Sequence, residues 1–398
     1  MKKSILTFVP YYLPAYKCGG PVRSIANMVA HLGDEFDFRI VTSDRDSFEE
    51  ISFHGIAVDA WNRVGKALVY YASPGNRTFV HYLRLMRETP HDVLYLNSYF
   101  NSVFTLLPLL ARRINHSRLA KPVILAPRGE FSLGAFALRF YKKSVYCYLI
   151  RIVGLCKDIV WQASSEYEAA DIRRVTGCSA DRIVIAPNMP PLQETPPESA
   201  IETSVRAKKH SGPLRVVFLS RISPKKNLSF ALRVLTRMSE PIEFNIYGLV
   251  DDEDYWRGCR EIIERSMPTC VRVCYRGVIQ HDLVSSVLAQ HDIFFLPTLG
   301  ENYGHVIYES LAVGVPVLIS DTTPWQDLGT ERVGWVVSLD TPEIFVDILE
   351  TQAHLPETER KAQRLRALSY ARRLTERSET LKTNRALFEK AANGNWLQ

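Results

Sequence analysis

The chain has 398 residues, of which 46% are hydrophobic and 23% are charged, and its formal net charge is +6. These fractions are those of an ordinary globular protein, and the length favours two domains of roughly 180 residues over one. No apolar run is long enough to cross a membrane, and the apolar start of the chain is too short for a secretory signal. We therefore expect a cytoplasmic protein.

The seven cysteines are odd in number and form no C-x-x-C pair. Cys270 and Cys274 share one face of a predicted strand, but no histidine stands at ligand spacing from them. We expect buried, reduced thiols rather than a metal site.

Charge is unevenly distributed along the chain. Residues 1–188 contain 24 Lys and Arg against 16 Asp and Glu, whereas residues 189–398 contain 25 against 27. The first half therefore carries the whole positive excess, which favours an anionic partner or surface there.

The first half alternates apolar runs, typical of buried strands, with segments of helical periodicity. The expected strands are 4–9, 37–42, 93–96, 121–126, 159–163 and 183–186, and the expected helices are 22–32, 78–88, 103–114 and one that opens at 164–166. This alternation predicts a parallel α/β sheet, in which ligands bind beyond the carboxyl ends of the strands.

Loops at strand ends carry the first candidate groups. Gly19 and Gly20 allow a ligand to approach the backbone, although a tight turn with positive φ explains the pair as well. The D-x-D pattern at 44–46 binds a divalent ion in some transferases, but here we expect two exposed loop acids and no metal.

A third such loop, Pro-Arg-Gly-Glu at 127–130, follows the strand at 121–126. We expect Arg128 to contact a phosphate or sugar and Glu130 to hold an acceptor hydroxyl. The alternative is a surface Arg–Glu pair that contributes little.

Segment 136–157 mixes basic and aromatic residues in a helical stretch. Such a helix favours peripheral contact with an anionic membrane surface. A domain helix with basic residues on its solvated face is the alternative.

A proline-rich, polar stretch at 189–212 shows no periodicity, so we place a linker there. After it, the expected strands are 214–219, 242–247, 271–275, 293–296 and 315–319, and the expected helices begin at 228, 280 and 305. Asp251–Asp254 resembles a metal cluster only in composition, and we expect a solvated helix start there.

Arg221 and Lys226 stand five apart in the loop after the strand at 214–219. Two like charges so close repel in water unless an anion lies between them. A diphosphate fits this role, because Arg binds it as a fork and Lys as a point charge. A basic surface loop is the alternative.

The segment FFLPTLGENYGHVIYESLAVGVPVLIS, 294–320, reads as strand, loop, helix and strand. Its loop at 300–304 precedes a helix N-terminus, which attracts anions. Glu301 and Glu309 bracket that turn, and acids beside an anion site suit a ligand that also carries hydroxyls. Two solvated surface acids are the alternative.

This segment resembles the E-x7-E motif of retaining glycosyltransferase family 4, and it looks most like the branch that builds bacterial surface polysaccharides. The resemblance implies the α/β GT-B fold, with two Rossmann-like domains whose parallel sheets face each other across a cleft. It implies an acceptor-binding domain at 1–188, a linker at 189–212 and a nucleotide-sugar domain at 213–375. The helix at 376–398 would return to the first domain.

The resemblance also implies roles for particular residues. Arg221 and Lys226 would hold the donor diphosphate and stabilise the leaving charge, Glu301 would hold the donor sugar, and Glu309 the ribose. The other expected donor contacts are Gly19, Gly20, Tyr275, Arg276, Val278, Asn302, Tyr303, Gly304 and His305. Many relatives have a histidine-rich segment after the third strand, where this chain has Asn97 and Tyr99. We therefore expect Asn97 and Tyr99 to contact the acceptor, with Asn97 binding a sugar hydroxyl.

The implied reaction moves a sugar from a nucleotide-diphosphate sugar to a glycan hydroxyl with retention and without metal or cofactor. The acceptor would be lipid-linked, which places the protein at the inner face of the cytoplasmic membrane, and no nucleic-acid partner is expected. Two alternatives remain open: another GT-B enzyme, such as a nucleotide-sugar epimerase or a phosphorylase, and a non-catalytic scaffold of a polysaccharide-assembly complex.

Overall fold

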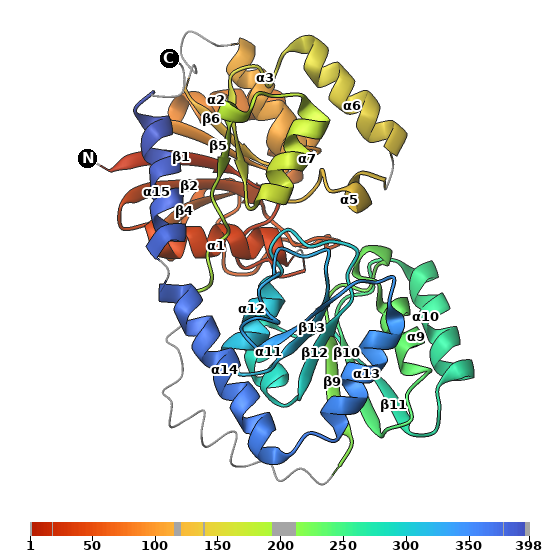
Figure 1. Ribbon diagram of the computed structural model, residues 1–398. Coiled ribbons are helices and arrows are strands. Elements are labelled where there is room, and N and C mark those ends of the chain that lie inside the picture. Colours follow the sequence, from red (N-terminus) through yellow and green to blue (C-terminus); the bar gives the residue numbers. More distant parts are fainter. Residues whose placement is uncertain are drawn as a thin grey trace. The chain divides into compact units, whose positions relative to one another are not determined.

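The computed structural model describes residues 2–17, 19–114, 121–137, 140–192, 212–376 and 378–394. The chain divides into two compact units, Met1–Leu192 with Arg377–Gln398 and Gln193–Glu376. Each unit has its own sheet with helices packed on it (Figure 1). Of the linker expected at 189–212, only residues 189–192 and 212 lie within the described part of the chain.

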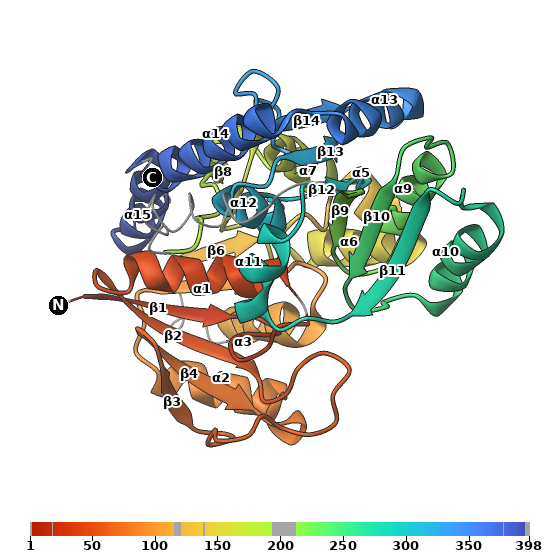
Figure 2. The same ribbon diagram turned by 90° about the horizontal axis from the view of Figure 1, so that it is seen from below.

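The sheet of the first unit has the order β3-β4-β2-β1-β5-β6-β7-β8. Its strands are β1 (Lys3–Phe8), β2 (Phe36–Ser43), β3 (Trp61–Val64), β4 (Ala67–Ala72), β5 (Val93–Asn97), β6 (Val123–Ala126), β7 (Ile159–Ala163) and β8 (Ile183–Ile185). All neighbours are parallel except β3 and β4, so the predicted parallel α/β sheet is confirmed with one antiparallel edge strand (Figure 2). The central strands are almost wholly buried, which explains their continuous apolar sequences.

The helices of this unit are α1 (Gly20–Leu32), α2 (Phe79–Glu88), α3 (Leu107–Ile114), α5 (Leu133–Ala137), α6 (Phe140–Val153), α7 (Glu166–Thr176) and α15 (Ser378–Ala392). The helix expected at 103–114 is interrupted, because a π-helical segment, Ser102–Leu106, precedes α3. Pro108 lies at the start of α3, where its missing N–H is tolerated. Short 3-10 turns lie at Pro74–Asn76 and Ala180–Arg182.

The hairpin of β3 and β4 escaped the sequence prediction. Strand β3 has the sequence WNRV and is half-exposed at the sheet edge, so it shows no apolar pattern. Strand β4, ALVYYA, is almost wholly buried and carries the same apolar signal as the strands that were predicted.

Helix α15 packs on the first sheet although it follows the second unit in sequence (Figure 1). The ring of Phe388 lies 5.6 Å from Phe36, 5.8 Å from Phe38 and 5.3 Å from Tyr95, measured between ring centroids. These contacts place the end of the chain in the core of the first unit.

The sheet of the second unit is parallel and has the order β11-β10-β9-β12-β13-β14. Its strands are β9 (Leu214–Leu219), β10 (Ile242–Tyr247), β11 (Val271–Gly277), β12 (Ile293–Leu296), β13 (Val317–Ser320) and β14 (Gly334–Val337). Its helices are α9 (Leu228–Leu235), α10 (Glu253–Ser266), α11 (His281–Ala289), α12 (His305–Ala312), α13 (Pro342–Ala353) and α14 (Glu357–Glu376), with a 3-10 turn at Pro224–Lys226. Strand β14 was not predicted, because it is short and half-buried.

Among the described residues, no helix is long and apolar enough to cross a membrane. The six cysteines in this part of the chain are free, and Cys259 is fully buried while the other five are half-buried. Asp252 caps α10 by accepting a hydrogen bond from the Tyr255 amide, which confirms the expected helix start at 251–254.

Candidate functional site

The site of the second unit lies at the carboxyl edge of its sheet. Strands β10, β9, β12 and β13 are neighbours and parallel, so the loops that follow them emerge at one edge. These loops carry Arg221, Lys226, Asp251 and Glu301. Sheet order therefore brings together residues that are far apart in sequence.

The loops after β9 and β12 are bound to each other through one carbonyl group. The carbonyl of Lys225 accepts hydrogen bonds from the Leu299 amide at 2.8 Å and the Thr298 hydroxyl at 3.1 Å. The hydroxyls of Ser320 and Thr322 in turn donate to the carbonyl of Thr298. The next residue, Lys226, is thereby held against the loop that carries Glu301.

Lys226 and Glu301 form an ion pair between the ammonium group and Oε1. Their side chains are 15% and 12% exposed, so this pair is largely shielded from water. Arg221 forms a second pair with Asp251, 3.0 Å between Nη1 and Oδ2, which is more exposed.

The repulsion expected between Arg221 and Lys226 is thus relieved without a bound anion, and their contact with a donor diphosphate stays a prediction. Each cation is already neutralised by its own carboxylate, contributed by a loop from a neighbouring strand. An anion that binds here must compete with Glu301 and Asp251.

The turn that leads into α12 depends on a glycine. Gly304 has φ +79°, and a Cβ there would lie 2.7 Å from Ile307 Cδ1, so only glycine fits without strain. The indole N–H of Trp325 donates to the carbonyl of Tyr303, and the two rings lie 5.6 Å apart. The ring of His305 lies 4.7 Å from that of Tyr303. Asn302 is half-buried in the same loop.

Glu309 lies half-buried on α12, one turn after its start. Burial raises the pKa of Tyr303, and the nearby carboxylate of Glu309 raises it further.

The three predicted donor contacts at the end of β11 are all exposed. The Tyr275 hydroxyl donates to the carbonyl of Gly248 at 2.9 Å. Arg276 donates to Asn245 at 2.8 Å and pairs with Glu243, so its guanidinium group lies along the sheet. A Cβ at Gly248 would lie 1.8 Å from the Ser220 carbonyl oxygen, so this turn requires glycine.

In the first unit, Gly19 and Gly20 begin α1 at the carboxyl side of β1. Gly19 has φ +57°, and a Cβ built on it would meet no atom within 4 Å, so its conformation and not crowding requires glycine. Gly19 therefore has the positive φ that the tight-turn alternative requires, and no atom occupies the space beside its backbone.

Tyr99 does not lie where an acceptor reaches it. Its ring is packed 4.9 Å from Phe131 and 5.8 Å from Trp161, inside the core of the first unit. The predicted contact of Tyr99 with an acceptor is therefore wrong. Its side chain is part of the hydrophobic core, which suits an aromatic residue.

Arg128 is the centre of a hydrogen-bond network and not half of a surface pair. It donates to Asn97 Oδ1 at 3.0 Å and 2.8 Å, to Asn188 Oδ1 at 2.6 Å, and to the hydroxyl of Tyr95. Tyr95 donates onward to Gln162, whose amide nitrogen lies 3.3 Å from the Asn384 oxygen on α15. The network thus joins the ends of β5 and β6 to the segment around Asn188 and to the last helix.

Asn97 is buried, and its Nδ2 is the donor in this network that has no hydrogen-bond partner among the described residues. The amide oxygen is occupied by Arg128.

Glu130 holds the loop that follows β5. One carboxylate oxygen accepts from the Ser98 hydroxyl, and the other from the amides of Tyr99 and Phe100 at 2.5 and 3.1 Å. Burial raises the pKa of Glu130, while these hydrogen bonds oppose the rise. Because both oxygens already have donors, the predicted hold on an acceptor hydroxyl would require the loop to open.

The acids of the D-x-D pattern are buried, so the expectation of two exposed loop acids is wrong. Asp44 pairs with Arg45 at 2.9 Å and Arg77 at 2.7 Å. Asp46 accepts hydrogen bonds from the amides of Tyr16 and Lys17 at 2.9 and 3.2 Å. The described residues contain no group of acids, histidines and cysteines suited to a metal ion.

Sequence reasoning missed Asp251 as a partner of Arg221, and it missed Glu168. Glu168 accepts from the Gly129 amide at 2.6 Å and from the Ser164 amide and hydroxyl at 2.8 Å, so it fixes the turn after Arg128. The only local signal was the acid three residues after Ser165, the pattern of a capping box.

The chain is similar in sequence and in fold to known proteins. Residues 213–352 match the family described as glycosyl transferases group 1. An uncharacterized 41.2 kDa protein in the cps region of Klebsiella pneumoniae is 21% identical over 338 residues, which cover 84% of this chain and 87% of that protein.

Solved structures resemble the whole chain. HepE from Anabaena, in complex with UDP and glucose, has a TM-score of 0.69 and 15% identity, with 98% of this chain and all of that chain covered (100%). WaaG, a glycosyltransferase involved in lipopolysaccharide biosynthesis, has a TM-score of 0.64 and 14% identity, covering 96% of this chain and 98% of its own. The chain thus has the GT-B fold, and residues 213–352 of its second unit match the glycosyl transferases group 1 model.

Proposed function

We propose that this protein is a retaining glycosyltransferase that moves a sugar from a nucleotide-diphosphate sugar to a hydroxyl of a growing, lipid-linked glycan in surface polysaccharide synthesis. The observation that carries the proposal is the shielded Lys226–Glu301 pair together with the Arg221–Asp251 pair, in the loops that follow β9, β10 and β12, the last of which leads into α12. This edge offers cations, a helix N-terminus and carboxylates together.

A diphosphate would bind by exchanging partners. Lys226 would leave Glu301 for a phosphate oxygen, and Arg221 would turn from Asp251 to do the same, since guanidinium and ammonium groups form strong hydrogen bonds with phosphate. The carboxylates released by this exchange are acceptors for sugar hydroxyls. Each ion pair would therefore supply a cation for the diphosphate and a carboxylate for the sugar of the donor.

The proposed chemistry breaks the bond between the anomeric carbon and the leaving phosphate oxygen. The acceptor oxygen forms the new bond on the same face of the sugar, and its proton passes to that phosphate oxygen. Negative charge grows on the leaving diphosphate, where Lys226, Arg221 and the helix N-terminus would stabilise it. Because these groups supply the positive charge, the proposal assigns no role to a metal ion.

The relatives support the substrate classes. HepE binds UDP and glucose, and UDP-glucose in a second complex, which makes a UDP-sugar the first donor to test. The relative in the capsule (cps) region and the lipopolysaccharide role of WaaG support a polysaccharide product.

The acceptor would bind in the first unit at the ends of β5 and β6. Asn97 is buried, but its Nδ2 has no hydrogen-bond partner among the described residues, so it is our candidate for a contact with a sugar hydroxyl once the loop after β5 opens. Arg128 is already occupied by three side chains, and we assign it to positioning Asn97.

Helix α6 supports peripheral contact with a membrane. Tyr141, Val145, Tyr148, Leu149 and Ile152 recur at helical spacing and are all exposed, Tyr141 to 84%. Lys142 and Arg151, also exposed, flank this apolar stripe in a helical projection. An apolar stripe with basic flanks suits the boundary of an anionic bilayer, where a lipid-linked acceptor resides.

The direct test is a thermal-shift series with UDP-, GDP-, ADP- and CDP-sugars on the wild type, on Lys226→Ala and on Arg272→Ala. Arg272 is an exposed cation near the opposite, amino end of β11 and serves as the matched control. A ligand at about 100 times its Kd should add about 2.7 kcal/mol of stability. We expect one nucleotide sugar to raise the Tm of the wild type and of Arg272→Ala but not of Lys226→Ala.

Product analysis of the same donor separates the alternatives. A new donor sugar formed without acceptor would indicate an epimerase, and dependence on inorganic phosphate a phosphorylase. If no nucleotide sugar raises the Tm at millimolar concentration, with or without divalent metal, the proposal fails and a scaffold becomes the explanation.

A further inference from the structure

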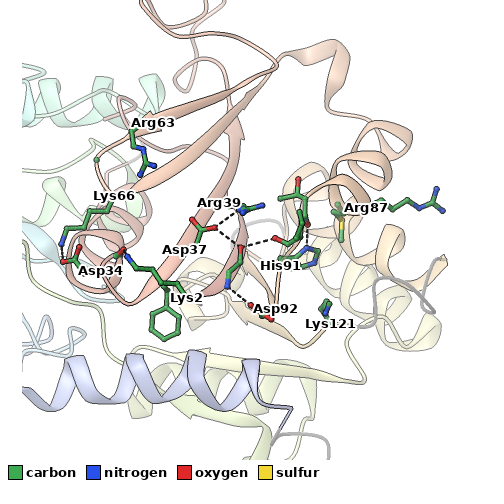
Figure 3. A pocket seen from close by; sticks show the side chains of 17 residues that line it. Lys2, Asp34, Asp37, Arg39, Arg63, Lys66, Arg87, His91, Asp92 and Lys121 are labelled. Carbon is green, nitrogen blue, oxygen red and sulfur yellow. Dashed lines mark hydrogen bonds and ion pairs between the residues drawn. The ribbon is translucent and has the colours of Figure 1, made fainter.

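A hollow of about 960 Å³ lies at the amino end of the first sheet. It is lined by residues at the starts of β1 and β2, at the turn between β3 and β4, and in the segment between α2 and β5 (Figure 3). The candidate loops of the first unit follow the carboxyl ends of these strands, so the hollow lies at the other end of the sheet. Its size is within the range of small-molecule sites, about 300–1,000 Å³.

The hollow has more cations than acids. Its lining carries three acids and six lysines and arginines, listed here as Asp34, Asp37, Asp92, Lys2, Arg39, Arg63, Lys66, Arg87 and Lys121. Each acid already has a partner: Asp34 pairs with Lys66, Asp37 with Arg39, and Asp92 accepts from the Ser4 amide at 2.8 Å.

Some cations of the hollow lack a carboxylate partner among the described residues, and Lys2 donates only to the carbonyl of Gly33. Arg63 and Lys121 form no ion pair with any described residue, and both are exposed on the lining. The hollow therefore has a net positive charge that an anion would neutralise.

The wall also contains a buried polar atom with no partner. His91 is 7% exposed; its Nδ1 lies 2.8 Å from the carbonyl of Thr89, so Nδ1 carries the proton and Nε2 is an acceptor. Nε2 has no hydrogen-bond partner among the described residues. Burial lowers the pKa of His91, the hydrogen bond to the Thr89 carbonyl opposes this shift, and nearby Lys121 adds to it.

Figure 3 shows His91, Asp92 and Lys121 together on one side of the hollow, with Lys2, Asp34 and Lys66 on the other. A ligand that lies beside His91 thus lies next to an unpaired ammonium group and next to an unused acceptor, Nε2, that is buried in the wall. A phosphate ion would fill only a small part of a hollow of about 960 Å³, and a neutral sugar would not neutralise Lys121.

We propose that this hollow binds an anionic saccharide, whose hydroxyl donates to His91 Nε2 and whose phosphate or carboxylate lies against Lys121. The site is separate from the proposed donor and acceptor sites and does not depend on the transfer reaction. It would hold an acidic sugar, either free or as part of a longer glycan, at the end of the sheet away from the candidate loops.

The test is isothermal titration calorimetry of the full chain with glucose 6-phosphate, inorganic phosphate and glucose. We expect saturable binding of glucose 6-phosphate, weaker binding of phosphate and none of glucose. Lys121→Glu should weaken the binding of glucose 6-phosphate by about tenfold or more, because it removes a charged contact. His91→Phe should reduce the affinity for glucose 6-phosphate to that for inorganic phosphate.

Two controls place the site. Lys382→Glu changes an exposed lysine of the same unit outside the hollow, and Lys226→Ala changes the proposed donor site; both should bind glucose 6-phosphate as the wild type does. Since His91 is buried, its variant is first checked for an unchanged melting curve, while the surface variant at Lys121 tests the site independently.

No saturable binding up to about 10 mM, or an unchanged affinity in Lys121→Glu, would overturn the site. Equal affinities for phosphate and glucose 6-phosphate, unaffected by His91→Phe, would overturn its assignment to a saccharide. Loss of binding in Lys226→Ala alone would place the sugar phosphate in the donor site and reject this proposal, whereas nucleotide-sugar binding tests the transferase independently.

Discussion

The ammonium group of Lys226 lies against the carboxylate of Glu301, 75 residues later in the chain, and both side chains are largely shielded from water. A shielded pair of this kind leaves an uncompensated charge when one partner is removed. It also offers a binding anion a cation already held in place by the hydrogen bonds to the Lys225 carbonyl.

Glu301→Gln should separate donor binding from transfer. The change leaves Lys226 without its carboxylate, so we expect a loss of about 1–3 kcal/mol in the free energy of unfolding. Because Lys226 stays available, the active nucleotide sugar should still raise the Tm. Turnover should fall by about a hundredfold, since a contact to the reacting sugar is lost.

Urea denaturation, thermal shift and transfer assays measure the three effects. Glu264→Gln, an exposed acid on α10, is the control and should change none of them. Transfer within twofold of the wild type would remove Glu301 from the proposed reaction.

Glu130 should make stability depend on pH. Burial raises its pKa in the folded state, so the folded protein binds this proton more tightly than the unfolded chain. Its contribution to stability is therefore full below the unfolded value of about 4.3 and is lost as the pH rises through the folded pKa. Glu130→Gln imitates the neutral form, so we expect the variant to lose less stability than the wild type as the pH rises above that value.

Unfolding free energies of the wild type, Glu130→Gln and Glu264→Gln from about pH 4 to about pH 7 test this point. Only Glu130→Gln should show an unfolding free energy that depends less on pH than that of the wild type. Parallel profiles for all three proteins would show that Glu130 titrates alike in the folded and unfolded states.

Helix α6 should mediate binding to anionic vesicles. Tyr148→Glu and Ile152→Glu place a negative charge in the exposed apolar stripe, so we expect co-sedimentation with vesicles of about 30% phosphatidylglycerol to fall by about tenfold or more. Val80→Glu, at an exposed valine on α2, is the matched control and should bind as the wild type does. A wild type that stays in the supernatant would contradict membrane contact.

Arg128 should contribute to the stability of the fold and not bind an acceptor directly. Its guanidinium group bonds to Asn97, Asn188 and Tyr95, so Arg128→Ala leaves three side chains short of a donor. We expect a loss of about 2–4 kcal/mol, with partial recovery in Arg128→Lys, because an ammonium group cannot reproduce the fork. Arg113→Ala, an exposed arginine on α3, is the control.

Chemical denaturation measures these losses. An unchanged free energy of unfolding combined with a higher KM for the acceptor would instead assign Arg128 to direct acceptor binding.

Most elements were predictable because hydrophobic periodicity is a local property of the chain. The expected strands at 159–163, 214–219 and 242–247 match β7, β9 and β10 to the residue. Strand β3 was missed because an edge strand needs no apolar face.

The sequence by itself determined the α/β class, the loops at strand ends and the E-x7-E segment, since each is written in neighbouring residues. Only the tertiary structure decided which charges meet. Lys226 pairs with Glu301, Arg221 with Asp251 and Arg128 with Asn97 because neighbouring parallel strands bring their loops to one edge. Burial of Tyr99, and exposure of the apolar stripe on α6, likewise depend on which faces the other elements cover, and no local pattern contains that information.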